Sequence, residues 1–474
     1  MLDVLATALR RDADRPALLG RRTVHRGQLA DLADGYAVAL HQRVGSGDTL
    51  GVAVRPGARA LALLLAAHRL GLRVAVLDPS AGPDVLLARL ALARPELVVA
   101  DAAAQAVAGW AGGLARRAKL ALPDLSALGP VVTVGRRLPG CAPVLAPASG
   151  VLPPCRAGTD AVVVFTSGTT SRPRAVVHTY ASLDAGMRAV ADLVRPEPGR
   201  PVLGGTTFVL VPALASGAPV ALPARSARGV ARQLRRLNPQ ATYLTPPRLR
   251  AALAVGARFT GRVWTGSAPA SANLLTRLRQ AGASEAWGVY ALTELFPAAA
   301  VESAEKSAFT GDGDLVGAPL PGVATRVVDG QLFLSGPSAA HRYLGEQPHE
   351  WVATGDVARL DGGRIVLGGR CKDMILRGAE NIYPGLYEPA LHVPGVNLAV
   401  LVGVPAPDGD ERLVAVVEPE PGADPRRVRA ALAEPLSRMG RARPDAVILA
   451  PVPVSGRSRK PDRAAAALLA AGRT

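Results

Sequence analysis

Apolar runs of helical length alternate with short strand-like runs along the first 80 residues, and this alternation limits how the chain can fold. An amphipathic stretch at residues 29–40 and a helical run at residues 58–70 are each followed by a strand-like run, at residues 50–54 and 74–77. Such alternation is typical of βαβ units, whose strands form a sheet with helices packed against it. The sequence therefore predicts an α/β fold of layered subdomains.

The same α/β pattern continues through the middle of the chain. We expect a helix at residues 230–237, strands at 241–244 and 262–265, and a further helix with Asn273 as its N-cap and Gly282 after its end. One earlier apolar stretch, residues 60–77, approaches the length of a membrane span. It is interrupted by His68, Arg69 and Arg73, so it predicts a buried helix that leads into a strand, and we expect no transmembrane segment.

Beyond residue 320 the pattern becomes β-rich and then changes again. Asp329-Gly330 and the Asp-Gly-Gly turn at residues 361–363 each separate two short strands, as in β-hairpins. After Gly369, a stretch of about a hundred residues has the pattern of a compact α+β unit. We therefore expect a large N-terminal domain with a β-rich subdomain, followed by a small mobile C-terminal domain, with these bounds: residues 1–368 and 369–474.

The net charge of +17 raises the alternative of a nucleic-acid-binding protein. However, the excess is arginine scattered along the chain, no run of five basic residues occurs, and only 4% of the residues are aromatic. This pattern argues against a nucleic-acid partner. A nucleic-acid-binding protein would show tight, salt-sensitive DNA binding. Lysines are rare by comparison and occur at four positions: Lys119, Lys306, Lys372 and Lys460.

Cysteine and histidine usage bears on the compartment and on metals. Three cysteines, an odd number, lie far apart, which is typical of a reduced cytoplasmic protein without a disulfide framework. The seven histidines have no metal-ligand spacing, which argues against a structural zinc site.

A β-branched run at residues 161–165 leads into a loop of small and hydroxylated residues, followed by the basic residues Arg172 and Arg174. Hydroxyls, exposed backbone N–H groups and positive charge together favour phosphate binding. The spacing differs from that of a nucleotide-binding P-loop, G-x-x-x-x-G-K-[ST]. The expected phosphate ligands are Thr166, Ser167, Gly168, Thr169, Thr170 and Arg174.

Four further motifs follow this loop in order, and together they identify a family resemblance. They are Tyr290-Ala-Leu-Thr-Glu294, Thr354-Gly-Asp356, residues 369–384 (GRCKDMILRGAENIYP) and Lys460-Pro-Asp-Arg463. The set resembles the adenylate-forming superfamily of acyl-CoA synthetases, luciferases and peptide-synthetase adenylation domains. It is most similar to an AMP-forming acyl-CoA ligase.

The resemblance implies a ligase that uses ATP and Mg²⁺. A carboxylic acid would become an acyl-adenylate with release of pyrophosphate, and the acyl group would pass to the thiol of CoA. Two alternatives share the first step: an enzyme that loads the pantetheine of an acyl carrier protein, and a synthetase that forms a lactone without a thiol. A degenerate, non-catalytic member is a further alternative, because Ser171, Arg174 and Ala175 depart from the family's glycine, lysine and glycine.

The resemblance also assigns roles to individual residues. Glu294 would hold Mg²⁺, with the Thr293 hydroxyl on the α-phosphate, and Asp356 would accept hydrogen bonds from the ribose. Lys372 would be the hinge, and Gly378 would line the path of the thiol. The other expected nucleotide contacts are Ser267, Ala268, Pro269, Tyr290 and Arg370.

The catalytic cation near the C-terminus has two candidates. Lys460 precedes the Pro-Asp-Arg that matches the family motif, whereas Arg457 follows a glycine, as the family's lysine often does. We favour Lys460, because a compact ammonium and a planar guanidinium are not interchangeable.

The acid is expected to lie against residues 208–214 and 264–267, which are mostly aliphatic. No basic or acidic side chain there matches an amino group or a second carboxylate. The sequence therefore favours an aliphatic substrate, such as a fatty acid.

Overall fold

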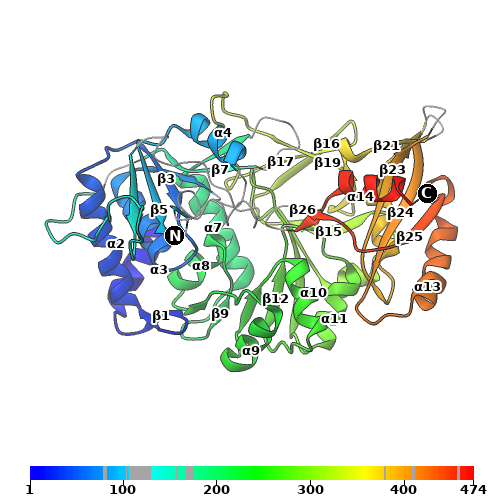
Figure 1. Ribbon diagram of the computed structural model, residues 1–474, viewed down its shortest axis with the longest axis horizontal. Coiled ribbons are helices and arrows are strands. Elements are labelled where there is room, and N and C mark those ends of the chain that lie inside the picture. The colour runs from blue at the N-terminus through cyan, green and yellow to red at the C-terminus, as the bar shows by residue number, and fades with distance from the viewer. Residues whose placement is uncertain are drawn as a thin grey trace.

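The computed structural model describes residues 1–77, 83–102, 104–105, 130–155, 158–166, 174–377, 380–406, 411–455 and 459–473. Two large sheets with helices packed around them make up most of the molecule, and a smaller sheet near the C-terminus lies at the opposite end from helices α2 and α3 (Figure 1). The predicted mixed α/β class, with a small C-terminal α+β unit, is confirmed.

The seven-stranded sheet has the order β18-β8-β7-β4-β3-β5-β6. Its strands from β7 to β6 in this order are parallel, whereas β8 and β18 are antiparallel additions at one edge. The strands are β3 (Thr49–Ala53), β4 (Arg73–Val76), β5 (Leu97–Asp101), β6 (Val131–Val134), β7 (Asp160–Phe165), β8 (Ala175–Thr179) and β18 (Arg342–Tyr343). The helices in this part of the chain are α1 (Leu2–Arg11), α2 (Arg26–His41), α3 (Ala58–Leu70), α4 (Pro83–Ala93) and α7 (Tyr180–Val194).

The thirteen-stranded sheet changes character along its width. From β1 to β13 its neighbours are mostly parallel, and from β14 onward they are antiparallel, in the order β16-β17-β19-β20-β15-β14-β13-β12-β11-β9-β10-β1-β2. The parallel part contains β1 (Pro16–Leu19), β9 (Val202–Leu203), β10 (Val220–Ala221), β11 (Ala241–Tyr243), β12 (Arg262–Thr265) and β13 (Glu285–Tyr290), with β2 (Val24–His25) antiparallel at the edge. Its helices are α8 (Thr207–Ala215), α9 (Ala227–Leu237), α10 (Pro246–Ala254) and α11 (Ala272–Gln280).

The antiparallel part is the predicted β-rich subdomain. Asp329 and Gly330 both have positive φ, 49° and 76°, as a two-residue hairpin turn requires. Gly362 and Gly363, in the second predicted hairpin, also have positive φ. The elements here are β14 (Ala299–Glu302), α12 (Ser303–Ala308), β15 (Asp314–Pro319), β16 (Ala324–Val328), β17 (Gln331–Ser335), β19 (Val352–Asp361) and β20 (Arg364–Arg370).

The C-terminal unit is built on the three-stranded sheet β23-β24-β25, with a helix on each face. Alternating residues of β24 face the two sides: Leu413 and Ala415 join the cluster under α13, whereas Val414 and Val416 join the cluster under α14. The elements are η3 (Cys371–Asp373), β21 (Ile375–Arg377), β22 (Glu380–Ile382), η4 (Pro384–Leu386), η5 (Glu388–Leu391), β23 (Val396–Pro405), β24 (Glu411–Pro419), α13 (Pro425–Arg438), η6 (Gly440–Ala442), β25 (Ala446–Leu449), β26 (Val454–Ser455), β27 (Lys460–Pro461) and α14 (Arg463–Ala471).

One helix start differs from its prediction. Helix α11 is capped by Ser271, whose hydroxyl accepts a hydrogen bond from the Leu274 amide at 3.3 Å, and Asn273 lies inside the helix. Serine and asparagine are equally good N-caps, so the earlier of the two begins the helix here. The run at residues 60–77 is α3 followed by β4, as expected. Within the described part of the chain, no helix is long and apolar enough to cross a membrane.

Candidate active site

Three of the predicted nucleotide residues meet at one buried carboxylate. Asp356 on β19 is 4% exposed and lies opposite Arg370 of β20 in the strand register. Its Oδ1 pairs with the Arg370 Nε at 2.6 Å, and its Oδ2 accepts a hydrogen bond from the Tyr290 hydroxyl at 2.5 Å. Each carboxylate oxygen has a second lone pair, so Asp356 can still accept bonds from two hydroxyls of a ligand.

Burial dominates the electrostatics of this trio. It raises the pKa of Asp356, although Arg370, Tyr290 and Lys460 oppose the shift. It also raises the pKa of Tyr290, and the adjacent Asp356 charge adds to that effect. The Tyr290 hydroxyl therefore stays protonated and donates to the carboxylate.

Glu294 lies in the connection between β13 and β14, where it is half-buried. Its Oε1 accepts a hydrogen bond from the Tyr343 hydroxyl at 3.1 Å, and its backbone carbonyl accepts one from the Ala340 amide at 2.7 Å. The neighbouring Thr293 is held through its carbonyl, which lies 2.7 Å from Nε2 of His178.

His178 supports this connection from β8. It is 1% exposed, and its Nδ1 lies 3.2 Å from the Ser182 hydroxyl. Burial lowers the pKa of His178, so the ring is neutral, with Nε2–H donating to the Thr293 carbonyl and Nδ1 accepting from Ser182.

Arg174 lies at the end of the predicted phosphate loop, but it also has a partner within the protein. Its guanidinium carbon is 4.7 Å from the ring centroid of Tyr343, a cation–π contact. The Arg174 carbonyl accepts a hydrogen bond from the Thr166 amide at 3.0 Å, which closes the base of the loop. The other predicted loop ligands, Ser167, Gly168, Thr169 and Thr170, lie outside the described residues, as do Ser171, Gly378 and Arg457.

Lys460 lies on β27 of the C-terminal unit. Although it is exposed to solvent, neighbouring atoms remove part of its hydration, which lowers its pKa. The charges of Arg370 and Lys372 lower the pKa further, whereas Asp356 and Glu294 act in the opposite direction. Lys460 therefore interacts electrostatically with both carboxylates that the sequence predicts to bind ligands.

Ser267, Ala268 and Pro269 follow β12, at the carboxyl ends of the parallel strands. Ser267 has a positive φ of 67°, and its hydroxyl lies 3.2 Å from that of Tyr243. In a parallel sheet this edge is where ligands commonly bind.

Residues 208–214, predicted to line the acid, differ in burial. Leu210, Val211 and Leu214 are at most 2% exposed and belong to the main core, whereas Phe208 and Val209 are half-buried. The Phe208 ring lies 3.9 Å from that of Phe296, between centroids. The Trp264 and Trp287 rings are stacked, with centroids 5.1 Å apart, whereas the Phe208 and Phe296 rings are tilted.

The donor set suits Mg²⁺ bound together with a nucleotide. No group of three His, Cys, Asp or Glu side chains that could hold a metal occurs among the described residues. A nucleotide-bound Mg²⁺ needs only one or two carboxylates, because phosphates and water supply the remaining oxygens. The half-buried Glu294 carboxylate, which is connected to the end of the loop through Tyr343 and Arg174, fits that requirement.

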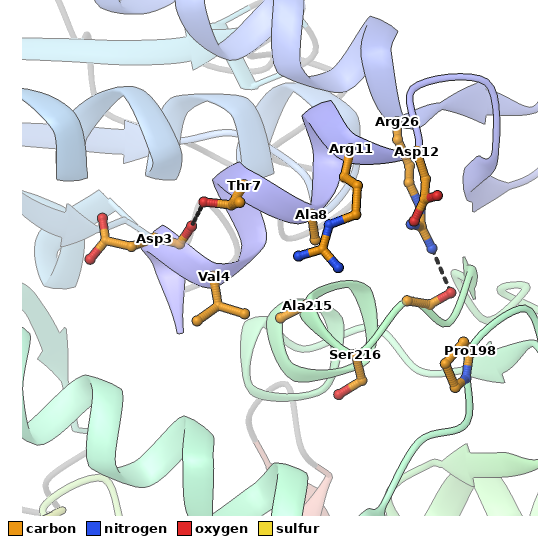
Figure 2. A pocket seen from close by; sticks show the side chains of 11 residues that line it. Asp3, Val4, Thr7, Ala8, Arg11, Asp12, Arg26, Pro198, Ala215 and Ser216 are labelled. Carbon is orange, nitrogen blue, oxygen red and sulfur yellow. Dashed lines mark hydrogen bonds and ion pairs between the residues drawn. The ribbon is translucent and has the colours of Figure 1, made fainter.

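A cavity of about 460 Å³ lies elsewhere, between α1 and the end of α8, where Thr7, Ala8 and Arg11 approach Ala215 and Ser216 (Figure 2). None of the motif residues lines it. It therefore plays no part in the candidate active site.

Comparison with known families identifies the family to which the chain belongs. Residues 5–344 match the family model described as "AMP-binding enzyme", which covers more than two thirds of the chain. The chain belongs to this family. The relationship predicted from the ordered motifs is thereby confirmed.

Individual relatives of this AMP-binding enzyme are distant. A feruloyl-CoA synthase from Amycolatopsis sp. is 29% identical over 298 residues, 55% of this chain and 60% of the relative. A fatty acid–[acyl-carrier-protein] ligase, ScoC, from Streptomyces coeruleorubidus is 30% identical over 308 residues, 56% of this chain and 59% of the relative. The chain thus matches only about 60% of the length of these curated relatives.

Solved structures match over nearly the whole length and show the fold. The amide bond synthetase McbA from Marinactinospora thermotolerans has a TM-score of 0.81 at 24% identity, covering 99% of both chains. The o-succinylbenzoate CoA synthetase from Bacillus subtilis, solved with its acyl-adenylate intermediate, has a TM-score of 0.76 at 19% identity, covering 97% of both.

The sequence analysis did not identify two residues of the candidate site. Tyr343 and His178 contact the Thr293-Glu294 connection, yet neither lies in a motif used above. Tyr343 lies on a two-residue strand, which has no period to detect. No local pattern marks His178, since its role depends on a contact 115 residues away.

Proposed function

We propose that the chain activates a carboxylic acid with ATP and transfers the acyl group to the thiol of CoA, releasing AMP. The observation that carries this proposal is the joining of Asp356 to Tyr290 and Arg370, with Lys460 nearby on the C-terminal unit. Membership of the AMP-binding family and the similarity to acyl-CoA ligases support it.

In the first step a carboxylate oxygen attacks the α-phosphorus of ATP, and the bond to the pyrophosphate oxygen breaks. Two anions must be aligned and their charge reduced, so binding and electrostatics supply most of the catalysis. Asp356 would bind the ribose hydroxyls, Tyr290 would lie against the adenine, and the Thr293 hydroxyl would contact the α-phosphate. Lys460 would stabilise the charge that develops between the carboxylate and the α-phosphate.

Other residues would complete the nucleotide site. Glu294 would hold Mg²⁺, which reduces the charge of the phosphates when it is bound. The remaining proposed contacts are residues 166–170, Arg174, Ser267, Ala268, Pro269 and Arg370.

In the second step the CoA sulfur attacks the acyl carbon of the adenylate, and AMP leaves. Gly378 would line the path of the thiol, and Lys372 would be the hinge of a small domain that begins at residue 369. These assignments, and the division into residues 1–368 and 369–474, are predictions from the family resemblance.

We propose an aliphatic acid as the substrate, such as a fatty acid. The aliphatic and aromatic character of the half-buried Phe208 and Val209 supports an apolar acid. The similar proteins include a fatty acid ligase and also a feruloyl-CoA synthase, so aromatic acids are the competitors to test.

A carrier-protein acceptor is the second candidate, favoured by the similarity to the fatty acid–[acyl-carrier-protein] ligase. Pyrophosphate exchange and AMP release, measured over a panel of aliphatic, aromatic and amino acids, separate the candidates. We expect exchange with aliphatic acids, and AMP release that increases when CoA is added. A response only to a pantetheine-bearing carrier protein, or AMP release without any thiol, would replace the CoA assignment. Activity restricted to aromatic or amino acids would refute the aliphatic substrate.

A further inference from the structure

Tyr343 connects the end of the phosphate loop to the proposed metal carboxylate. One face of its ring is covered by the Arg174 guanidinium, 4.7 Å from the centroid, and its hydroxyl donates to Glu294 Oε1 at 3.1 Å. Arg174 and Glu294 are 120 residues apart in the sequence, and this one side chain contacts both.

The backbone around Tyr343 is held in place on both sides. Tyr343 pairs with Val176 in the antiparallel β18–β8 register, and Val176 lies only two residues after Arg174. The next amide, that of Leu344, donates to the Ala175 carbonyl at 2.8 Å. A short strand thus connects the residues that follow the loop to the residues that hold Glu294.

An ion-pair cluster fixes this two-residue strand. Arg342 donates two hydrogen bonds to Asp160, at 3.0 and 2.7 Å, and Arg73 donates a third at 3.2 Å. Arg342 and Arg73 are each 23% exposed and Asp160 is 13% exposed, so the cluster is shielded from solvent. β18 is too short to be stable alone, and this bidentate pair supplies part of its attachment.

We infer that Tyr343 is a positioning residue. It fixes the orientation of the Glu294 carboxylate, and through Arg174 it couples that orientation to the conformation at the end of the phosphate loop. A guanidinium plane stacks on an aromatic ring, whereas a lysine ammonium offers only a point charge. The arginine at position 174 therefore acts through Tyr343, in addition to any direct contact with phosphate. This inference rests on the proposed function, because it assigns the purpose of the contact to metal and nucleotide binding.

The test distinguishes the contribution of the Tyr343 hydroxyl from that of its ring. Tyr343→Phe removes the hydrogen bond to Glu294 and keeps the stacking surface, whereas Tyr343→Leu removes both, and Arg174→Lys removes the stacking guanidinium. The readouts are Mn²⁺ binding, followed by electron paramagnetic resonance as a probe of the metal site, and equilibrium binding of α,β-methylene-ATP, which cannot be adenylated.

We expect Tyr343→Phe to raise the Mn²⁺ concentration for half-saturation about tenfold in the presence of the nucleotide analogue, because a hydrogen bond to a charged group is lost. At saturating Mn²⁺, its affinity for the analogue should change less than about twofold. In the wild-type background, Arg174→Lys should weaken analogue binding about threefold to tenfold. When Arg174→Lys is added to Tyr343→Leu, it should change analogue binding little further.

Arg326→Lys is the matched control, because Arg326 makes the same kind of contact with Trp351, at 4.2 Å. Neither binding measurement should change in this variant.

Unchanged Mn²⁺ binding in Tyr343→Phe, or additive effects of the changes at positions 174 and 343, would overturn the inference. If Tyr343→Leu does not fold, Tyr343→Phe and Arg174→Lys decide the question on their own. Wild-type protein that does not bind the analogue would refute the proposed function and the inference together. Normal wild-type binding with unaffected variants would refute the inference alone.

Discussion

At the scale of single residues, the buried Asp356 illustrates a conflict between stability and binding. Burial raises its pKa above the ordinary value, so the folded protein holds the proton more tightly than the unfolded chain does. The corresponding stability is present at low pH and is lost as the pH rises through the folded-state pKa. At neutral pH the charged Asp356 therefore lowers the stability of the fold.

This predicts opposite effects of Asp356→Asn on stability and on binding. The neutral amide removes the cost of a buried charge, so the melting temperature at pH 8 should equal or exceed that of the wild type, with a smaller difference at pH 5. Nucleotide affinity should fall about tenfold or more, because charged acceptors bind hydroxyls more strongly. Thermal denaturation at both pH values and analogue binding test this, with Asp361→Asn as a half-buried control. A melting temperature that falls further at pH 8 than at pH 5 would contradict the assignment.

Pyrophosphate exchange can show whether Lys460 or Arg457 is the catalytic cation. We expect Lys460→Ala to reduce pyrophosphate exchange about a hundredfold or more, because it removes a charge that acts in the transition state. Arg457→Ala should retain most of the exchange. If Arg457→Ala abolished exchange and Lys460→Ala did not, Arg457 would be the catalytic cation.

Asp356, Arg370, Glu294 and Lys460 could be named as candidates from the sequence because each lies in a short motif. The sequence did not predict that Tyr290 donates to Asp356, since the two residues are 66 positions apart and meet only through the sheet. It likewise assigned Arg174 to phosphate alone, because its stacking on Tyr343 depends on a strand pairing that no local pattern reveals.

At the scale of elements, β8 supports the Glu294 connection through His178. Burial lowers the pKa of His178 below the ordinary value, so the stability it contributes is present above the ordinary histidine pKa and is lost as the pH falls through the folded-state pKa. His178→Leu should cost about 1–3 kcal/mol of unfolding free energy at pH 8, since it leaves the Thr293 carbonyl without its donor.

Urea unfolding from pH 5 to pH 8 measures this effect. The cost of His178→Leu should shrink toward pH 5, because proton binding to His178 in the unfolded chain already destabilises the wild type there. His41→Leu, at the exposed end of α2, is the control and should show no such trend. A pH-independent cost at position 178 would mean that His178 contributes only through packing.

Elements with enough residues to show a period were predicted well, and very short ones were not. The helix at residues 58–70 has the predicted bounds, because a long apolar run ends at Gly71, whose φ of 65° suits glycine. The strand β18 has two residues and therefore no period to detect. Its existence depends on the Arg342–Asp160 pair, which joins residues 182 positions apart.

At the scale of the whole molecule, ion pairs and hydrogen bonds attach the C-terminal unit to the rest of the chain. Arg277 of α11 forms an ion pair with Glu420, directly after β24. Burial lowers the pKa of the nearby Arg250 to about 10, while the charge of Glu418 opposes that shift. The Gly313 amide also donates to the Leu386 carbonyl at 3.0 Å. These contacts hold the C-terminal unit, which carries Lys460, in the position in which Lys460 and Asp356 interact electrostatically.

Breaking the Arg277–Glu420 pair should therefore slow the step that needs Lys460. A half-buried pair of this kind contributes on the order of 1 kcal/mol, so Arg277→Ala or Glu420→Ala should reduce pyrophosphate exchange about fivefold. The reversed pair, Arg277→Glu with Glu420→Arg, should recover part of the loss, because it restores the attraction with different side chains. Arg438→Ala breaks an exposed pair within α13 and is the matched control. Because the pair lies outside the proposed nucleotide site, analogue binding should stay within about twofold in all variants. Loss of binding in step with exchange would show that these residues stabilise the fold instead of holding Lys460 in place.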